Sequence, residues 1–414
     1  MQLLIVSQYF WPENFRVNDL ATEMARRGHS VTVLTGLPNY PEGSVLPEFR
    51  RDPSRFSRFN DVEIVRVPIA PRGHGSARLV LNYLSFIVTA ALFGVWRLRG
   101  KRFHAVFVFQ PSPITSCLPA LLLGRVKSAP VLLWVLDLWP ETLSALGVVK
   151  SRWLLRAVGR LVSFIYSRCD LVLAQSHSFV GSIEKYLRDR ERIRYLPGWA
   201  EPLFTSDVER AEAADEMRAH SDTFNVLFAG NIGDAQDFPS ILDAADRLRN
   251  RTDIRWLILG DGRAAAWVAS EINRRSLGDN VRMLGRYPIE RMPSFFRDAG
   301  ALLVSLKRDP VFAMTIPGKV QSYLAAGRPI VGMIDGEGAR VIEESGAGLV
   351  CPSGDAEALA GCVERLAALS SEARAEMAAR GREYARREFD RERLLTQLEL
   401  WMREPPRKSH ASRS

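Results

Sequence analysis

Short apolar runs alternate with longer amphipathic stretches along almost the whole chain. This alternation is typical of parallel sheets covered by helices. In the first half it predicts strands at residues 3–7, 31–35, 63–67, 105–109, 131–136 and 171–174. In the second half it predicts strands at residues 225–228, 255–259, 281–284, 301–304, 329–333 and 348–351. The pattern therefore predicts an α/β protein with two sheets.

The chain of 414 residues is too long for one hydrophobic core and suits two domains. Residues 202–222 are polar and lack a strand pattern, which indicates a linker and an entry helix. We expect an N-terminal domain at 1–201, to which residues 385–404 cross back, a C-terminal domain at 202–384, and a disordered tail at 405–414. Two doubly wound, Rossmann-like domains facing a central cleft are predicted, with ligands at the carboxyl ends of strands.

Residues 79–96 form an uncharged apolar run that is long enough to span a membrane and is flanked by arginines. Asn82, Ser85 and Thr89 nevertheless give this run one polar stripe at helical spacing. Because it lies between two predicted strands, it is better explained as a crossover helix. A plain core helix and a crossover whose outer face dips into lipid both remain open. The basic residues around it, and those at 150–160, favour a peripheral position on the inner face of the cell membrane.

Charge and cysteine content narrow the class of partner. The net charge of +9 and pI near 9.6 favour an anionic partner, either a nucleotide diphosphate or anionic lipid. No nucleic-acid-binding signature is present, so nucleic acid is not expected. The four cysteines show no metal-binding spacing and suggest a reducing compartment. The N-terminus enters a strand directly without a leader pattern, so we expect a cytoplasmic protein.

The most informative segment spans residues 316–348 and reads IPGKVQSYLAAGRPIVGMIDGEGARVIEESGAG. It predicts a helix from Lys319 to Ala326, a buried strand, a glycine loop and a second helix that opens near Ala339. Unpaired amides at a helix N-terminus suit a phosphate, and Lys319 adds a positive charge. The loop candidates are Gly336, Glu337, Gly338 and Ala339. The alternatives are an ordinary β-turn-α unit and a solvated lysine.

Three further polar residues are candidates in the N-terminal domain. Asp137 follows an apolar strand, so it lies at the carboxyl edge of the sheet. There it could act as a base, orient a substrate or accept hydrogen bonds from one. Its alternative role is a helix N-cap. Glu13 and Asn14 follow the first strand and are candidates for contact with a substrate.

These motifs together resemble the family-4 retaining glycosyltransferases. The lysine, the AAGRP turn and the GxG that ends the segment 316–348 resemble their nucleotide-sugar-binding half. Residues 1–35 resemble the family as well, as do VLDLWPETL (135–143), YLPGWAEPLF (195–204) and LFAGNIGDAQDF (227–238). The resemblance covers nearly the whole chain and is closest to the branch that builds colanic acid and O-antigen, often described as L-fucosamine transferases. It implies the GT-B fold.

The resemblance also implies an activity and its partners. A UDP-sugar would donate an N-acetylated hexosamine or deoxyhexosamine, with retention. The acceptor would be a polyprenyl-diphosphate-linked saccharide or a growing surface polysaccharide, at the inner membrane surface. Other polysaccharide-assembly enzymes are further expected partners, and no cofactor is expected. Two alternatives are a GT-B nucleotide-sugar epimerase and a non-catalytic nucleotide-binding subunit.

The donor site implied by the resemblance includes Gly230, Asn231 and Ser322, with Lys319 and Asp137 as catalytic candidates. Two glutamates of relatives correspond here to Met314 and Ser322. An arginine and a lysine that grip the diphosphate correspond to Asn231 and Gln236. The charge would then be met by Lys319, the amides of 336–339, and Arg340 or Arg286. The chain contains no Asp-x-Asp, so we expect transfer without a metal.

Overall fold

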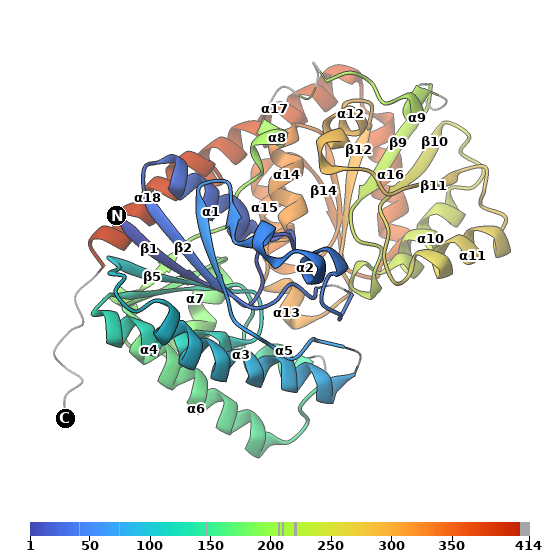
Figure 1. Ribbon diagram of the computed structural model, residues 1–414. Helices are drawn as coiled ribbons and strands as arrows, with labels where there is room; N and C mark the ends of the chain where they lie inside the picture. The colour runs from blue at the N-terminus through green and yellow to red at the C-terminus, as the bar shows by residue number, and fades with distance from the viewer. Residues whose placement is uncertain are drawn as a thin grey trace. The chain divides into compact units, whose positions relative to one another are not determined.

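A computed structural model describes residues 1–40, 42–73, 75–145, 147–205, 208, 211–218 and 222–405 (Figure 1). The chain divides into two compact units. Unit 1 comprises Met1–Leu196 and the chain from Leu395, and unit 2 comprises Pro197–Leu394. The sequence placed the boundary after residue 201 and the returning segment at 385–404. The predicted tail lies outside the described residues from position 406 onward.

Unit 1 is built on an eight-stranded sheet with the order β3-β4-β2-β1-β5-β6-β7-β8. All pairs are parallel except β3 with β4. The strands are β1 (Gln2–Val6), β2 (Ser30–Thr35), β3 (Arg58–Phe59), β4 (Val62–Arg66), β5 (Ala105–Gln110), β6 (Val131–Val135), β7 (Leu171–Ala174) and β8 (Ile193–Tyr195). All six strands predicted here are confirmed. The two missed strands, β3 and β8, are short edge strands without an apolar run.

Helices cover the sheet of unit 1. They are α1 (Arg16–Arg26), α2 (Pro47–Arg51), α3 (Ser76–Arg97), α4 (Cys117–Lys127), α5 (Glu141–Ala145), α6 (Arg152–Arg168), α7 (His177–Glu184) and most of α18 (Arg391–Arg403). Helix α4 packs against both α3 and α6, and the three lie along one side of the sheet (Figure 1). Strands β5 and β6 are buried along their whole length. Helices therefore enclose the centre of this sheet.

Helix α3 contains the apolar run of residues 79–96 and is a crossover, as predicted. It joins β4 and β5, which belong to the same sheet. By length and composition it could also cross a membrane. Only 22% of its most apolar 18-residue window is buried in the protein. A span would separate two strands that the sheet holds together. The crossover explains the position of the helix, and its low burial leaves an apolar surface open.

Unit 2 is built on a six-stranded, fully parallel sheet with the order β11-β10-β9-β12-β13-β14. The strands are β9 (Phe224–Ala229), β10 (Ile254–Leu259), β11 (Val281–Gly285), β12 (Ala301–Ser305), β13 (Ile330–Met333) and β14 (Gly348–Cys351). All six were predicted. Val226 and Phe228 belong to one apolar cluster, and the intervening Leu227 belongs to the other. Both faces of the sheet are therefore covered, as in a doubly wound domain.

The helices of unit 2 are α8 (Pro202–Thr205), α9 (Asp215–Arg218), α10 (Phe238–Arg247), α11 (Ala265–Arg274), α12 (Met292–Arg297), α13 (Pro310–Ala313), α14 (Gly318–Ala326), α15 (Gly336–Ser345), α16 (Ala356–Ala368) and α17 (Ser371–Glu388). One prediction needs correction. The glycine loop at 336–339 is the first turn of α15, which begins three residues earlier than expected. Its N-terminal amides are therefore those of the glycines themselves.

Candidate active site

Helix α14 places Lys319 at the carboxyl end of β9. The Tyr323 hydroxyl donates to the Ala229 carbonyl oxygen at 3.2 Å and accepts from the Ala229 amide at 3.3 Å. This pair fixes α14 against the strand end. One turn earlier on the helix, the Lys319 ammonium lies 3.5 Å from the centre of the Phe228 ring. A Cβ at Gly230 would lie 2.7 Å from Lys319 Cε, and the φ of +143° at Gly230 is a conformation that favours glycine.

Beyond its contact with the Phe228 ring, the Lys319 ammonium has no hydrogen-bond or ion-pair partner among the described residues. Its Nζ is shielded from solvent and makes no hydrogen bond within the described part of the chain, although the residue as a whole is only partly buried. This desolvation lowers the pKa of Lys319 to about 7. A buried cationic group without a partner is costly, so the arrangement favours an anionic ligand at this position. The alternative of a solvated lysine is excluded.

The first turn of α15 lies beside the residues that precede α14. Gly336 has φ +68°, and a Cβ there would lie 1.9 Å from the Ala313 carbonyl oxygen. A Cβ at Gly338 would lie 3.0 Å from Pro317 Cδ. The N-cap residue Asp335 does not cap this turn with its side chain. The glycines therefore allow close packing while the first-turn amides lack a side-chain cap.

The charged side chains of α15 itself pair with one another. Glu337 is buried and lies 2.7 Å from Arg340, which also lies 2.7 Å from Glu344. Arg340 is thus held along its own helix and is a weaker candidate for a diphosphate than Lys319. Ala339 lies in the same turn and contributes only its backbone.

The first two residues of the loop after β9 are exposed to solvent. Gly230 and Asn231 are both exposed. The Gln236 side chain instead accepts a hydrogen bond from the Gly233 amide at 3.1 Å and shapes the loop. Neither loop position that the resemblance assigns to a cation carries one here. Lys319 reaches the start of this loop from α14 and supplies a positive charge there.

A carboxylate lies at the position where Ser322 replaces the glutamate of relatives. The Ser322 hydroxyl is 3.1 Å from a carboxylate oxygen of Glu201 and 3.1 Å from the Gly318 carbonyl oxygen. Ser322 is three residues after Lys319, so the two side chains share one face of α14. Sequence reasoning missed Glu201, because its spacing from α14 along the chain gives no local signal.

Asp137 follows β6 in unit 1 and has several partners. Its carboxylate accepts hydrogen bonds from Thr142 Oγ1 at 2.5 Å and from Trp139 Nε1 at 3.1 Å. Burial raises the pKa of Asp137, and hydrogen bonds from Thr142, Ser112 and Trp139 oppose that rise. The residue precedes α5 by four positions, so it is not the N-cap of that helix. It remains a candidate at the carboxyl edge of the sheet.

Glu13 holds loops together. One carboxylate oxygen accepts hydrogen bonds from the Asn39 and Tyr40 amides, both at 2.7 Å, and the other accepts from the Phe10 amide at 3.3 Å. Burial raises the pKa of Glu13 to about 7, although these amides oppose the rise. Its oxygens are occupied by backbone, which indicates a structural role. Asn14 is exposed and stays a candidate.

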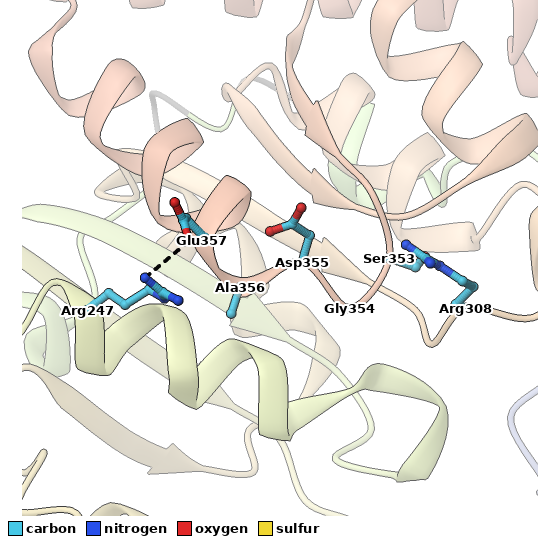
Figure 2. A pocket seen from close by; sticks show the side chains of 7 residues that line it. All are labelled: Arg247, Arg308, Ser353, Gly354, Asp355, Ala356 and Glu357. Atoms are coloured by element: carbon cyan, nitrogen blue, oxygen red, sulfur yellow. Dashed lines mark ion pairs between the residues drawn. The ribbon is translucent and has the colours of Figure 1, made fainter.

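A separate hollow of about 610 Å³ lies at the start of α16 (Figure 2). Arg247 and Glu357 form an ion pair across it at 3.4 Å. Its other lining residues are Arg308, Ser353, Gly354, Asp355 and Ala356. None of the predicted site residues lines it. Within the described residues, no group of three or more His, Cys, Asp or Glu side chains could hold a metal ion.

Comparison with known families agrees with this geometry. Residues 14–199 match the glycosyl transferase 4-like domain, and residues 223–368 match the glycosyl transferases group 1. Together the two matches span most of the chain. The chain belongs to this glycosyltransferase family. It is therefore a hexosyltransferase with the two Rossmann-like units of the GT-B fold.

Individual relatives are distant but cover most of the glycosyltransferase. It is 26% identical over 299 residues to the probable glycosyltransferase WbjE of Pseudomonas aeruginosa, covering 70% of this chain and 73% of that one. It is 26% identical over 342 residues to the putative colanic acid biosynthesis glycosyl transferase WcaI of Escherichia coli K12, covering 79% and 82%. Anabaena Alr3699/HepE, solved with UDP and glucose, has 13% identity and a TM-score of 0.65 over 97% of this chain and 99% of that one.

Proposed function

We propose that this glycosyltransferase moves a hexosyl group from a UDP-sugar to a lipid-linked or growing polysaccharide, with retention, in surface polysaccharide synthesis. The observation that carries the proposal is the solvent-shielded ammonium of Lys319 beside Gly230, which makes no hydrogen bond to any described residue. The Alr3699/HepE complex with UDP and glucose supports the donor class, and the similarity to WcaI, a putative colanic acid biosynthesis glycosyl transferase, supports the pathway. The resemblance favours an N-acetylated hexosamine or deoxyhexosamine as the transferred sugar.

The chemistry assigns a clear task to Lys319. The bond between the anomeric carbon and the diphosphate oxygen breaks, and the anomeric carbon forms a new bond to an acceptor hydroxyl oxygen. That hydroxyl passes its proton to the departing diphosphate oxygen, and UDP leaves with the electron pair of the broken bond. A fixed ammonium and the first-turn amides of α15 stabilise the negative charge that develops on the diphosphate. Asp137 is the candidate to accept a hydrogen bond from the acceptor.

The outer face of α3 supports a membrane-bound acceptor. Its polar stripe points inward: Asn82 accepts from Gln8 Nε2 at 2.6 Å, and the Ser85 hydroxyl accepts from the Ala70 amide at 2.9 Å. The opposite face is apolar and exposed, with Leu84 at 54% and Leu92 at 66% exposure. An amphipathic helix at the surface of a water-soluble protein normally has its apolar face toward the core and its polar face toward solvent.

The neighbouring helices extend this surface. Trp153 of α6 is 72% exposed, and Val126 of α4 is also exposed. Helices α3, α4 and α6 carry eight arginines or lysines and no acidic residue. Apolar side chains beside unopposed positive charge favour an anionic lipid surface. We therefore propose peripheral attachment to the cytoplasmic face of the cell membrane through the α3–α4–α6 face.

Vesicle binding tests this attachment. Leu84→Glu and Leu92→Glu should each weaken binding to vesicles that contain anionic phospholipid, and high salt should weaken binding by the wild type. Each basic residue near such a surface contributes about 1 kcal/mol. Leu400→Glu is the matched control, because Leu400 is equally exposed at 54% but lies on α18. Equal binding by Leu84→Glu and wild type would remove the proposal. Release only by detergent would favour a spanning helix.

Product analysis tests the reaction. The purified enzyme, a panel of UDP-hexoses and UDP-N-acetylhexosamines, and a polyprenyl-diphosphate-linked saccharide should give UDP and an extended saccharide whose new linkage keeps the donor configuration. Epimerisation of the donor without acceptor would support the epimerase alternative. Complete absence of donor hydrolysis and transfer, with UDP still bound, would support the non-catalytic subunit. Analysis of surface polysaccharide from a deletion strain would identify the missing sugar.

A further inference from the structure

Arg72 is a partly buried cation in unit 1 that the predicted site does not include. It lies on the connection between β4 and α3. One guanidinium nitrogen, Nη1, is 3.3 Å from the Tyr9 hydroxyl, and Cζ is 5.4 Å from the centre of the Tyr40 ring. The Arg72 amide donates to the Asn39 side chain at 2.9 Å, which fixes the backbone. Across the described ranges of the chain, no carboxylate pairs with this guanidinium.

A neighbouring arginine shows how a structural guanidinium is held in the same unit. Arg66 is buried and donates to the carbonyl oxygens of Gly36 at 3.0 Å, of Phe56 and of Trp11. Its donors are thus taken up by backbone. Among the described residues, the Arg72 guanidinium contacts one phenol oxygen and one ring face, although a guanidinium has five N–H donors. Arg72 therefore retains unused capacity for an anion.

The polar side chains of Tyr83 and Ser112 lie in the neighbourhood of Arg72 and Asp137. The Tyr83 hydroxyl comes from α3 and lies close enough to Arg72 for the positive charge to lower its pKa, against the larger effect of burial, which raises it. Ser112, in the loop after β5, lies close enough to Tyr83 and to Asp137 to oppose the rise in the pKa of each. A guanidinium and a carboxylate thus share one neighbourhood of polar side chains at the carboxyl edge of the sheet.

We propose that Arg72 binds the phosphate of a lipid-linked acceptor, with the Tyr83 hydroxyl as a second donor and Asp137 on the saccharide side. This inference rests on the proposed function and names the acceptor class for that site. A guanidinium can donate two parallel hydrogen bonds to a phosphate, which a carboxamide cannot. The lipid chain would follow the exposed apolar face of α3, and the saccharide would extend toward Asp137.

The headgroup of a bulk anionic lipid offers the same phosphate chemistry. We assign Arg72 to the acceptor because it is partly buried and shares the neighbourhood of Tyr83 and Ser112 with Asp137. The exposed basic residues, such as Arg78 at the start of α3 and Arg156 on α6, are better placed for bulk lipid. The two sources predict different effects of substitution, so one set of variants separates them.

The experiment compares two acceptors that carry the same saccharide, one on a polyprenyl diphosphate and one on an uncharged alkyl chain. Arg72→Gln should raise the KM for the diphosphate acceptor by about 10- to 100-fold, as expected for loss of a charge-assisted hydrogen bond, and should change the KM for the uncharged acceptor little. Arg72→Lys keeps the charge but not the fork, and should fall between the two. Hydrolysis of the UDP-sugar without acceptor should be unchanged.

The matched control is Arg78→Gln, which should weaken vesicle binding while preserving the preference for the diphosphate acceptor. The inference is overturned if Arg72→Gln and Arg72→Lys both leave that preference intact, or if Arg72→Gln lowers vesicle binding while the acceptor KM stays the same. Failure of the wild type to bind UDP or use any UDP-sugar would instead contradict the proposed function.

Discussion

Two charged side chains at the carboxyl edges of the two sheets are held in opposite ways. Asp137 in unit 1 accepts hydrogen bonds from Thr142 and Trp139. Lys319 in unit 2 is also shielded from solvent, but its Nζ makes no hydrogen bond to any residue that the structure describes. Burial favours the neutral form of both groups. It raises the pKa of Asp137 and lowers the pKa of Lys319 to about 7.

The difference separates a carboxylate that already has protein donors, even if it also meets the acceptor, from an ammonium that has no hydrogen bond within the described residues. The hydrogen-bond donors that surround a buried carboxylate also order the loop that carries them. Leaving an ammonium unsatisfied lowers the stability of the empty protein. Retaining such a group is consistent with a ligand that brings the missing negative charge. Asp137 should therefore matter for stability, and Lys319 should matter chiefly for turnover.

The largest effect is expected for Lys319→Met. Loss of a donor aimed at developing charge costs about 2.7–4 kcal/mol, or about 10²–10³ in turnover. Because methionine keeps the aliphatic stem without a buried charge, the empty protein should be at least as stable as the wild type. The measurements are donor turnover and the thermal midpoint. Lys319→Ala should lose turnover by a similar factor.

Lys185→Ala is the control for general loss of a lysine, because Lys185 is exposed at the end of α7. Near-normal turnover in Lys319→Met would contradict the assignment of Lys319 to the diphosphate. It would mean that the diphosphate is bound by other groups and that the buried ammonium has a structural cause.

Asp137→Asn should show the opposite balance. A carboxamide has one acceptor oxygen instead of two, so it cannot accept both the Thr142 and the Trp139 hydrogen bonds as a carboxylate does. Its NH₂ group would face one of these two donors without an acceptor. We expect a loss of about 1.5–3 kcal/mol in the free energy of unfolding, as for hydrogen bonds to charged groups. Chemical denaturation of the full chain checks this. Unchanged stability with a large loss of turnover would instead make Asp137 a directly reacting group.

Much of this comparison could be predicted from the sequence. Every predicted strand is present, because buried parallel strands leave unbroken apolar runs such as those of β1 and β6. Lys319 stood out because a lysine in the first turn of a helix opposes the helix dipole. Asp137 stood out because it follows an apolar strand directly. Local pattern was sufficient wherever the signal lay within one element.

The remaining features depend on contacts between distant segments. Glu201 meets Ser322 across 121 positions of sequence, so no local motif indicates it. The sequence predicts Glu13 as a site residue, but its carboxylate accepts hydrogen bonds from the Asn39 and Tyr40 amides, which are distant in sequence. The start of α15 was misplaced because glycines have poor helix propensity, and tertiary packing against Ala313 and Pro317 overrides that preference here.

The pH dependence of UDP affinity gives a smaller test of the same contrast. In the empty enzyme the pKa of Lys319 is about 7, and a bound diphosphate should raise it. Above pH 7, binding therefore requires uptake of a proton, and affinity should fall by up to about tenfold per pH unit. Calorimetry between pH 7.5 and 9, in buffers of different ionisation enthalpy, measures both effects. Lys319→Met should bind more weakly and without this slope.

The same pKa shift fixes the sign for stability. The folded pKa of Lys319 lies below its unfolded value, so between about pH 7 and 10 the unfolded state holds more protons. The stability of the empty enzyme should therefore rise with pH across that window, relative to Lys319→Met. A relative fall would show that the ammonium is stabilised in the folded enzyme and would contradict its unpartnered state.

The smallest expected effect is that of a chelator. If Lys319 and the first-turn amides of α15 stabilise the departing diphosphate, EDTA should leave turnover unchanged. A complete loss of turnover that magnesium or manganese restores would mean that a cation enters with the nucleotide. Lys319 would then be one of two positive groups on the diphosphate, and Lys319→Met should cost correspondingly less than 10²-fold.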